Sequence, residues 1–238
     1  MDLFGQPADY GKINSLAAKK GLFVIEDAAQ SFGAEYRGRK ACSLAGVGAT
    51  SFFPAKPLGC YGDGGMVFTD DDGLYEGLTS VRVHGKGSDK YDNIRIGING
   101  RCDTLQAAIL LAKFEIFPGE IDLRQEVAGR YTVLLKGPVQ TPAVPEGLTS
   151  AWAQYSILAA EASRRAPLMT ALRNAGIPTA IYYPKPLHRQ PAFASLGYQR
   201  GDFPVSDDYA DRILSLPMHP YLEAPDQRRI AQLIAGCR

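Results

Sequence analysis

The chain is poor in the residues that build metal sites and disulfide frameworks. Its 238 residues include three histidines and four cysteines, and no two cysteines form a C-x-x-C pair. His84, His188 and His219 are too scattered along the sequence to suggest a metal site. The four dispersed cysteines are too few for a dense disulfide framework. The sequence therefore predicts no metal and indicates a reducing, cytoplasmic location.

Long apolar runs and blocks of like charge are also missing. No stretch approaches the ~18 apolar residues of a membrane-spanning helix, and Met1 is followed by Asp2 rather than by a charged and apolar leader. The 26 basic and 25 acidic residues leave a formal net charge of +1. We therefore expect neither a membrane nor a nucleic acid as a partner. Glycine-rich signatures for NAD or ATP are not complete either.

The sequence does contain enough apolar residues, 45% of the total, for a large core. We expect helices at 8–20, 71–81, 103–117, 120–136, 165–174 and from 226 onward. We expect strands at 22–25, 46–53, 64–69, 154–158, 179–183 and 213–216. The uninterrupted apolar run at 22–25 is typical of a buried strand in a mainly parallel sheet, where ligands bind at the carboxyl ends. The loop at 85–93 is interpreted as mobile or partner-facing.

This order of elements predicts an α/β large domain over residues 1–117 and a connecting helix over 118–137. After residue 137 the order of the expected helices and strands changes. Residues 138–238 are therefore expected to form a small C-terminal α+β domain.

Three residues near the predicted strand ends could carry out chemistry with pyridoxal 5′-phosphate (PLP). PLP needs a lysine that forms a Schiff base, an anion at its pyridine nitrogen and donors for its phosphate. Lys56 lies between two predicted strands, among apolar residues with few charges nearby. Asp27 follows a strand, where it could pair with the pyridine nitrogen or simply cap the next segment. Ser51 could donate to the phosphate or be an ordinary strand residue.

Seven ordered segments along nearly the whole chain resemble the DegT/DnrJ/EryC1/StrS sugar aminotransferases. That family consists of fold type I PLP enzymes with an aspartate-aminotransferase-like fold. The matching segments are 26–33 (EDAAQSFG), 51–59 (SFFPAKPLG), 62–65 (GDGG), 97–101 (GINGR), 103–108 (DTLQAA), 183–188 (YPKPLH) and 216–220 (LPMHP). The resemblance implies an incomplete, mainly parallel central sheet with helices plus a smaller domain.

The resemblance also implies a role for each of five cofactor-binding residues. Lys56 would be the catalytic Schiff-base lysine and Asp27 the partner of the pyridine nitrogen. Gln30 would lie beside the 3-hydroxyl of PLP, and Ser51 would bind the phosphate. Asn99 would reach the phosphate of a neighbouring subunit, which implies a homodimer with shared active sites.

For the substrate, the resemblance implies amino transfer from glutamate to a UDP- or dTDP-linked keto-sugar in bacterial polysaccharide and O-antigen synthesis. The motifs are most similar to the branch that aminates a 3-keto UDP-sugar uronic acid. Arg101 would lie near the sugar, where its fork could bind a carboxylate or phosphate. Tyr182 and Tyr183 are expected in the substrate loop, although the family usually has histidine at position 182. His188 is a further candidate in that loop.

Two alternatives remain beside the aminotransferase. The family's N-terminal portion, which carries a Gly-Thr phosphate loop and a stacking aromatic ring, is expected to be missing because the matching region begins close to Met1. The chain would then be a truncated, non-catalytic remnant or assembly partner. A PLP-dependent sugar dehydratase is less favoured, because that branch has histidine where this chain has Lys56.

Overall fold

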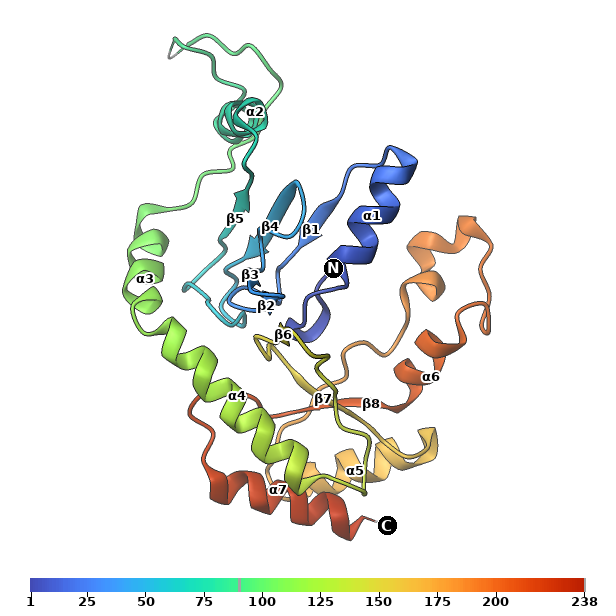
Figure 1. Cartoon of the computed structure of the whole chain (residues 1–238). Helices are drawn as coiled ribbons and strands as arrows, with labels where there is room; N and C mark the ends of the chain where they lie inside the picture. The colour runs from blue at the N-terminus through green and yellow to red at the C-terminus, as the bar shows by residue number, and fades with distance from the viewer. Residues whose placement is uncertain (90, 238) are drawn as a thin grey trace. The chain divides into compact units, whose positions relative to one another are not determined.

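The computed structural model describes residues 1–89 and 91–237, and the chain divides into two compact units. Unit 1 contains Met1–Ile121 and Val144–Ala153, and unit 2 contains Asp122–Ala143 and Gln154–Arg238. Helix α4 (Phe117–Leu134) runs without a break through the boundary (Figure 1). The sequence analysis divided the chain into three parts at residues 117 and 137, and that division stays a prediction.

Unit 1 is built around a three-stranded sheet in the order β1–β4–β5 (Figure 1). Its strands are β1 (Ile25–Asp27), β4 (Val47–Ser51) and β5 (Gly65–Phe68). β1 runs parallel to β4 with Asp27 beside Ala49, and β5 runs antiparallel to β4. The parallel pair confirms the expected α/β arrangement and brings the carboxyl ends of β1 and β4 to the same edge of the sheet.

A second, smaller sheet of unit 1 includes a segment that returns late in the chain. It has the order β3–β2–β6, formed by β2 (Glu35–Tyr36), β3 (Arg39–Lys40) and β6 (Leu148–Thr149). Beyond β6, the Ala151 amide donates to the Gly5 carbonyl at 2.8 Å. The return segment 144–153 therefore completes unit 1 by pairing with its N-terminal part.

The helices of unit 1 are η1 (Leu3–Gly5), α1 (Tyr10–Lys20), α2 (Asp72–Arg82), α3 (Thr104–Phe114) and the start of α4. Two helices of unit 1, α1 and α2, begin at an aspartate that caps them, whereas the helix expected at 103–117 ends at Phe114. Asp9 caps α1 by accepting from the Lys12 amide, and Gly21 ends the helix at φ 62°. Asp71 caps α2 by accepting from the Leu74 amide at 2.8 Å, as expected. Residue 90, inside the predicted loop at 85–93, lies outside the described residues.

The prediction of a buried strand at 22–25 is wrong. Leu22, Phe23 and Ile25 are 64%, 67% and 62% exposed, and β1 begins only at Ile25. β1 forms one edge of its sheet, and β4 is its only strand neighbour among the described residues. Val67 on β5 is also 49% exposed. The apolar run therefore marks a surface rather than a core in the part of the chain that the structure describes.

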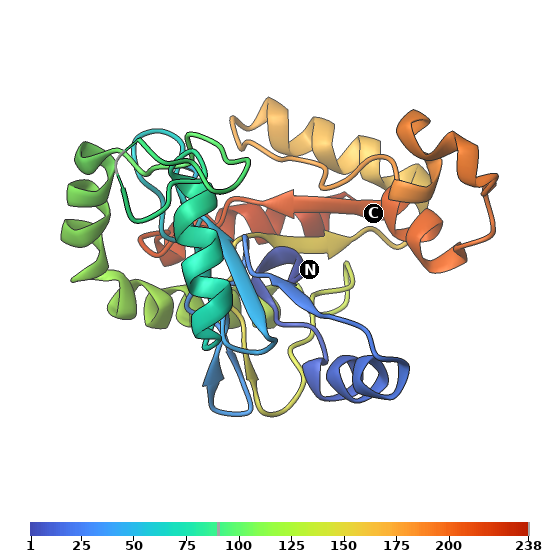
Figure 2. The same ribbon diagram turned by 90° about the horizontal axis from the view of Figure 1, so that it is seen from above.

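Unit 2 is the expected α+β arrangement, with β7 and β8 side by side (Figure 2). Its elements after α4 are β7 (Tyr155–Leu158), α5 (Ala162–Asn174), η2 (Leu187–Arg189), η3 (Pro191–Leu196), α6 (Pro204–Arg212), β8 (Ile213–Leu216) and α7 (Ala224–Gly236). The strand predicted at 179–183 is wrong, because only Ala180 forms a bridge, to Ser215. Helix α6 was not predicted.

The core of unit 2 joins the C-terminal half of α4 to β7 and α7. The rings of Tyr131 and Tyr155 lie 5.0 Å apart, and both side chains are fully buried. The fully buried Gln227 donates to the Val127 carbonyl at 2.8 Å and accepts from Arg130 at 2.6 Å. Buried amide groups are stable when both their donor and acceptor are paired in this way.

Among the described residues, no helix combines the length and the apolar character that a membrane crossing requires.

Gly5→Ala is expected to destabilise the protein by about 2 to 4 kcal/mol. Gly5 has φ 102°, and a Cβ there would lie 2.7 Å from the Trp152 amide nitrogen, so the return segment would have to shift. Chemical denaturation measures the effect. The matched control is Gly77→Ala in α2, where a Cβ meets nothing within 4 Å. We expect this control to be neutral or to stabilise by up to ~1 kcal/mol, and equal losses in both variants would contradict the close contact at Gly5.

Candidate functional site

Asp27 and Ser51 end the two parallel strands at the same edge of the sheet. The Asp27 side chain is exposed, and its Oδ1 accepts from the Ala29 amide at 3.2 Å. The local capping role considered for Asp27 is thus present, but the carboxylate still faces solvent. The Ser51 Oγ accepts from the Phe53 amide at 3.2 Å. This bond leaves the Ser51 hydroxyl proton available for donation to a ligand.

Lys56 lies on a closed loop that connects β4 to β5. The Phe52 amide donates to the Gly64 carbonyl at 2.7 Å, and the Cys60 amide donates to the Phe52 carbonyl at 2.8 Å. Within the loop, the Lys56 amide donates to the Phe53 carbonyl at 2.9 Å. These bonds fix the backbone on both sides of a half-buried lysine.

The conformation of this loop depends on Gly59 and on two hydrogen bonds from helix α3. A Cβ on Gly59 would lie 2.7 Å from the carbonyl oxygens of Phe53 and Pro54, so the turn requires glycine. The Lys113 ammonium donates to the Gly59 carbonyl, and the Gln106 side chain accepts from the Tyr61 amide at 2.8 Å. The sequence analysis missed these two supports. Gln106 stood inside a matching motif, but no local signal marked Lys113.

Within residues 1–89 and 91–237, no carboxylate forms an ion pair with Lys56. Asp27 thus provides a carboxylate at the end of β1, and Ser51 provides a hydroxyl proton at the end of β4. Lys56 provides an amine on the loop that follows β4. These groups match the pyridine nitrogen, the phosphate and the aldehyde of PLP, respectively. The donor set therefore fits this cofactor.

Gln30 lies in the turn after β1, but its side chain is buried. Its Oε1 accepts from the Phe4 amide at 2.6 Å, and only 4% of the residue is exposed. The carboxamide oxygen is therefore tied to η1. The predicted contact between Gln30 and the cofactor 3-hydroxyl stays a prediction.

Asn99 and Arg101 lie on an exposed segment that folds back on the end of α2. The Ile98 amide donates to the Val81 carbonyl at 2.8 Å, and the Gly100 amide donates to the Arg82 carbonyl at 2.8 Å. These bonds fix the backbone on either side of Asn99. Both predicted ligand-binding side chains remain accessible. The structure does not join them to Lys56 by a hydrogen bond.

The substrate-loop residues belong to unit 2. Tyr182 and Tyr183 are 37% and 48% exposed, and their rings lie 5.6 Å apart. His188 differs, because its side chain is only 8% exposed. Its ring centroid lies 4.9 Å from that of Phe203, and its Nε2 lies 3.5 Å from Asp207 Oδ1. The role of these residues in substrate binding stays a prediction, and the burial of His188 favours a supporting position.

Asp207 is a buried residue that the sequence analysis missed. Its Oδ2 accepts from the Gly201 amide at 2.7 Å, and its Oδ1 lies 3.3 Å from an Arg189 guanidinium nitrogen. The Gly201 bond and the Arg189 charge lower the pKa of this carboxyl. Asp207 thus joins α6 to both ends of the segment 189–201. Its only local signal was its place in the first turn after Pro204.

Glu26 immediately precedes Asp27 but points to the opposite face of β1. It is fully buried, and its two oxygens accept from the amides of Cys42 at 2.6 Å and Leu44 at 2.8 Å. Burial raises the pKa of this carboxyl. The sequence analysis placed both acids at the strand end without separating their faces.

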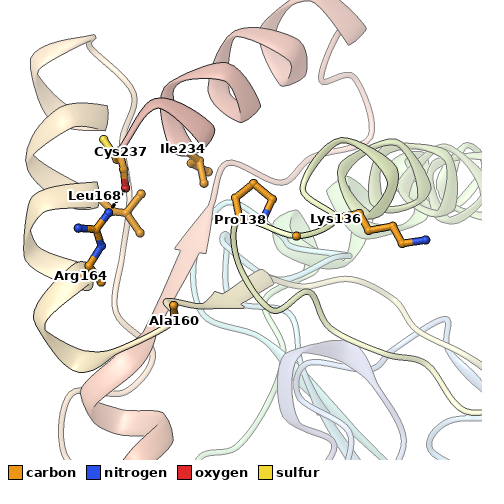
Figure 3. A pocket seen from close by; sticks show the side chains of 8 residues that line it. Lys136, Pro138, Ala160, Arg164, Leu168, Ile234 and Cys237 are labelled. Atoms are coloured by element: carbon orange, nitrogen blue, oxygen red, sulfur yellow. Dashed lines mark hydrogen bonds between the residues drawn. The ribbon is translucent and has the colours of Figure 1, made fainter.

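Two cavities in the described part of the chain, one in each unit, are lined by none of the predicted site residues. Unit 2 has a cavity of about 470 Å³, in which the Arg164 guanidinium donates to the Cys237 carbonyl (Figure 3). Unit 1 has a cavity of about 920 Å³ beside β5 and α2. We place the candidate site by the strand ends and the Lys56 loop, because these positions carry the reactive groups.

Comparison with curated proteins gives relatives over most of the chain. It is 49% identical over 224 residues to the UDP-2-acetamido-2-deoxy-3-oxo-D-glucuronate aminotransferase of Pseudomonas aeruginosa, covering 94% of this chain and 60% of that protein. It is 43% identical to a pleiotropic regulatory protein of Geobacillus stearothermophilus, covering 98% and 63%. The chain thus spans about 60% of the length of the curated relatives it matches.

Solved structures share the fold. A DegT/DnrJ/EryC1/StrS aminotransferase from Brucella abortus superposes on this chain with a TM-score of 0.93 at 51% identity. The match covers 99% of this chain and 62% of that one. A Bacillus subtilis protein solved with bound cofactor PMP gives a TM-score of 0.87 at 27% identity, covering 99% and 55%. The profile of the DegT/DnrJ/EryC1/StrS aminotransferase family matches residues 1–235. The chain therefore belongs to the DegT/DnrJ/EryC1/StrS aminotransferase family.

Proposed function

We propose that this chain carries PLP on Lys56 and forms the catalytic core of a sugar-nucleotide aminotransferase. The observation that carries the proposal is the half-buried Lys56 on its closed loop, which follows the strand that ends at Ser51, with Asp27 at the end of the neighbouring strand. The related Bacillus subtilis structure holds PMP, the amino form of PLP. PLP, when bound, supplies a conjugated ring that takes up the negative charge left when a substrate carbon loses a proton.

Each of the three groups has a distinct task. The Lys56 amine would bind the cofactor covalently through its aldehyde carbon and, once released, move a proton to or from the substrate carbon. The Asp27 carboxylate would keep the pyridine nitrogen protonated. The Ser51 hydroxyl would donate to the phosphate, and the closed loop would limit the movement of Lys56.

The amino donor we propose is glutamate, and the acceptor is a UDP-linked 3-keto sugar, preferably a uronic acid. The acceptor class follows the Pseudomonas aeruginosa relative. Arg101 is exposed and has no carboxylate partner among the described residues, so its fork is available for a sugar carboxylate or a phosphate. Tyr182 and Tyr183 are accessible for contacts with the sugar. The product would serve polysaccharide and O-antigen synthesis from the cytoplasm.

We also propose a homodimer in which Asn99 reaches the cofactor phosphate of the partner subunit. Ile96 and Ile98, on the same segment, are 99% and 64% exposed. Apolar side chains this exposed are favourable contacts for a second subunit. An active site shared across this segment would explain why the fixed backbone around Asn99 presents its side chain outward.

A non-catalytic assembly partner is the competing function. It is the alternative that the sequence analysis left open, and it stays a prediction. Such a chain could retain the Lys56 loop without turning over. The two functions differ in whether Lys56 binds PLP and whether glutamate then changes the bound cofactor.

The first test is covalent capture of the cofactor. After incubation with PLP and reduction with borohydride, mass spectrometry is expected to find PLP on the peptide that contains Lys56. Lys56→Ala should lose this label and the visible absorbance of bound PLP, which should shift when glutamate is added to the wild type. The matched control is Lys19→Ala on the exposed end of α1, which should keep both signals. Wild-type protein that takes no label at Lys56 would contradict the proposed chemistry.

The second test separates the two substrates. Arg101→Lys is expected to raise the KM for a UDP-linked 3-keto sugar acid by about tenfold or more, because lysine cannot form the two parallel bonds of a guanidinium. The half-reaction with glutamate should change by less than about twofold. Arg95→Lys, on the same exposed segment, is the control and should leave both unchanged. Equal effects on sugar and glutamate would rule out a sugar-specific role for Arg101.

A further inference from the structure

The segment 181–201 of unit 2 begins and ends at one continuous stretch of the chain. At its start, the Ala180 and Ser215 amides each donate to the carbonyl of the other residue, at 3.2 and 2.8 Å. At its end, the Gly201 amide donates to Asp207 Oδ2 at 2.7 Å. Asp207 lies on α6 and Ser215 on β8, and α6 leads directly into β8 (Figure 1). The segment is therefore a loop with both ends fixed to the same base.

The buried Asp207 carboxylate also binds the loop 181–201 at its middle. The Arg189 guanidinium donates to Asp207 Oδ1 at 3.3 Å, and His188 Nε2 lies 3.5 Å from the same oxygen. The side chains of Asp207 and His188 are 7% and 8% exposed. The bonds from Gly201 and Arg189 lower the pKa of the carboxyl, so it is ionised at neutral pH. A buried charge loses much more than an exposed one when its partners leave, so these contacts favour a closed loop.

The backbone bonds within the loop do not fix its position. The Gln190 amide donates to the Leu187 carbonyl at 3.0 Å, and the Phe193 amide donates to the Gln190 carbonyl at 2.9 Å. Each of these bonds joins residues three apart, as in a single turn of 3-10 helix. They hold short turns together but do not reach α6 or β8. The position of the loop on its base therefore depends on side-chain contacts such as those of Asp207.

A second contact between the loop and α6 is more exposed. The Arg200 guanidinium donates to the Asp211 carboxylate, and the Arg200 side chain is 62% exposed. Water screens ion pairs at such positions, so they contribute little to stability. We therefore expect the buried Asp207 to hold the loop more strongly than Asp211 does.

Tyr182 and Tyr183 lie between two of the anchored points. They follow the bridge at Ala180 directly, and the contacts of His188 and Arg189 come a few residues later. Both tyrosine side chains are accessible. An open loop would present the two rings in many orientations, whereas a loop that is fixed on both sides of them restricts those orientations before a ligand binds.

We propose that Asp207 is a positioning residue that keeps the loop 181–201 closed on α6 and thereby orients Tyr182 and Tyr183 for the sugar. Asp207 acts through the loop, because both of its oxygens already accept from loop residues. The closed loop rests on the contacts within unit 2 alone. The consequence for the sugar rests on the proposed function.

Limited proteolysis of the whole chain with chymotrypsin tests whether Asp207 closes the loop. Phe193 and Tyr198 are cleavage sites inside the loop, whereas the fully buried Tyr155 on β7 is an internal reference. We expect Asp207→Ala to raise the rate of cleavage at Phe193 and Tyr198 by about tenfold or more, because the loss of bonds to a charged acceptor increases the open population. Cleavage at Tyr155 should stay within about threefold of wild type.

The matched control is Asp208→Asn, one residue further along α6. Asp208 is exposed and pairs with Arg212 on the same helix, so cleavage in the loop should stay within about twofold of wild type. Unchanged cleavage in the loop of a folded Asp207→Ala, or an equal rise at Tyr155, would overturn the closed loop. If that variant does not fold, Asp207→Asn decides, because it keeps the shape and one acceptor oxygen. It should raise cleavage in the loop by about threefold or more, and an unchanged rate would overturn the proposal.

Steady-state kinetics separate positioning from a purely structural role. We expect Asp207→Ala to raise the KM for a UDP-linked 3-keto sugar acid by about tenfold or more, because the two tyrosines lose their fixed orientation. The half-reaction with glutamate should change by less than about twofold. Asp208→Asn should leave both unchanged. Equal losses with sugar and glutamate would assign Asp207 a purely structural role and overturn the positioning.

Proteolysis and kinetics together distinguish the closed loop from the proposed function. Wild-type protein that binds no PLP, while Asp207→Ala still opens the loop, would overturn the proposed function and leave the closed loop standing. Wild-type protein that turns over, with the same KM for the sugar in an opened Asp207→Ala variant, would overturn the positioning role alone.

Discussion

The alternation of side chains along β1 is the constraint on which the candidate site depends. Two adjacent acids, Glu26 and Asp27, must point to opposite faces of a strand. One is fully buried and bonded to backbone amides, while the other is exposed at the carboxyl end. A shift of one residue in the register with β4 would exchange them, leaving a buried Asp27 and an exposed Glu26. The chemistry of this edge therefore depends on the pairing of Asp27 with Ala49.

The backbone contributes as much to the site as the reactive side chains do. Lys56 is presented by a loop whose ends are bonded to each other through Phe52, Gly64 and Cys60. Gly59 permits the close turn, and α3 satisfies the Gly59 carbonyl through Lys113. A lysine loses conformational entropy when it forms a covalent bond. Because the backbone of this loop is already fixed, the backbone contributes little to that loss.

Local signals in the sequence were sufficient for most of the fold and for naming the candidate site residues, whose roles stay predictions. Asp71 and Gly21 marked helix ends, and the motifs marked Lys56, Asp27 and Ser51. What the sequence could not provide depends on neighbours far along the chain. The exposure of Phe23 and Ile25 reflects what lies beside β1, since an apolar run has the same letters in a core and on a surface. The short strands β2, β3 and β6 have too few residues to show a period. The contacts of Glu26 and Asp207 join residues that no local pattern relates.

The return segment has a consequence for the order in which the protein forms during synthesis. β6 and Ala151 complete the small sheet and the Gly5 contact of unit 1, although they follow the first part of unit 2 in the sequence. A ribosome must therefore release residue 153 before unit 1 can close, by which time Asp122–Ala143 has already emerged. The N-terminal region cannot reach its final state as an early, independent product of translation, and its completion is coupled to that of the polypeptide after it.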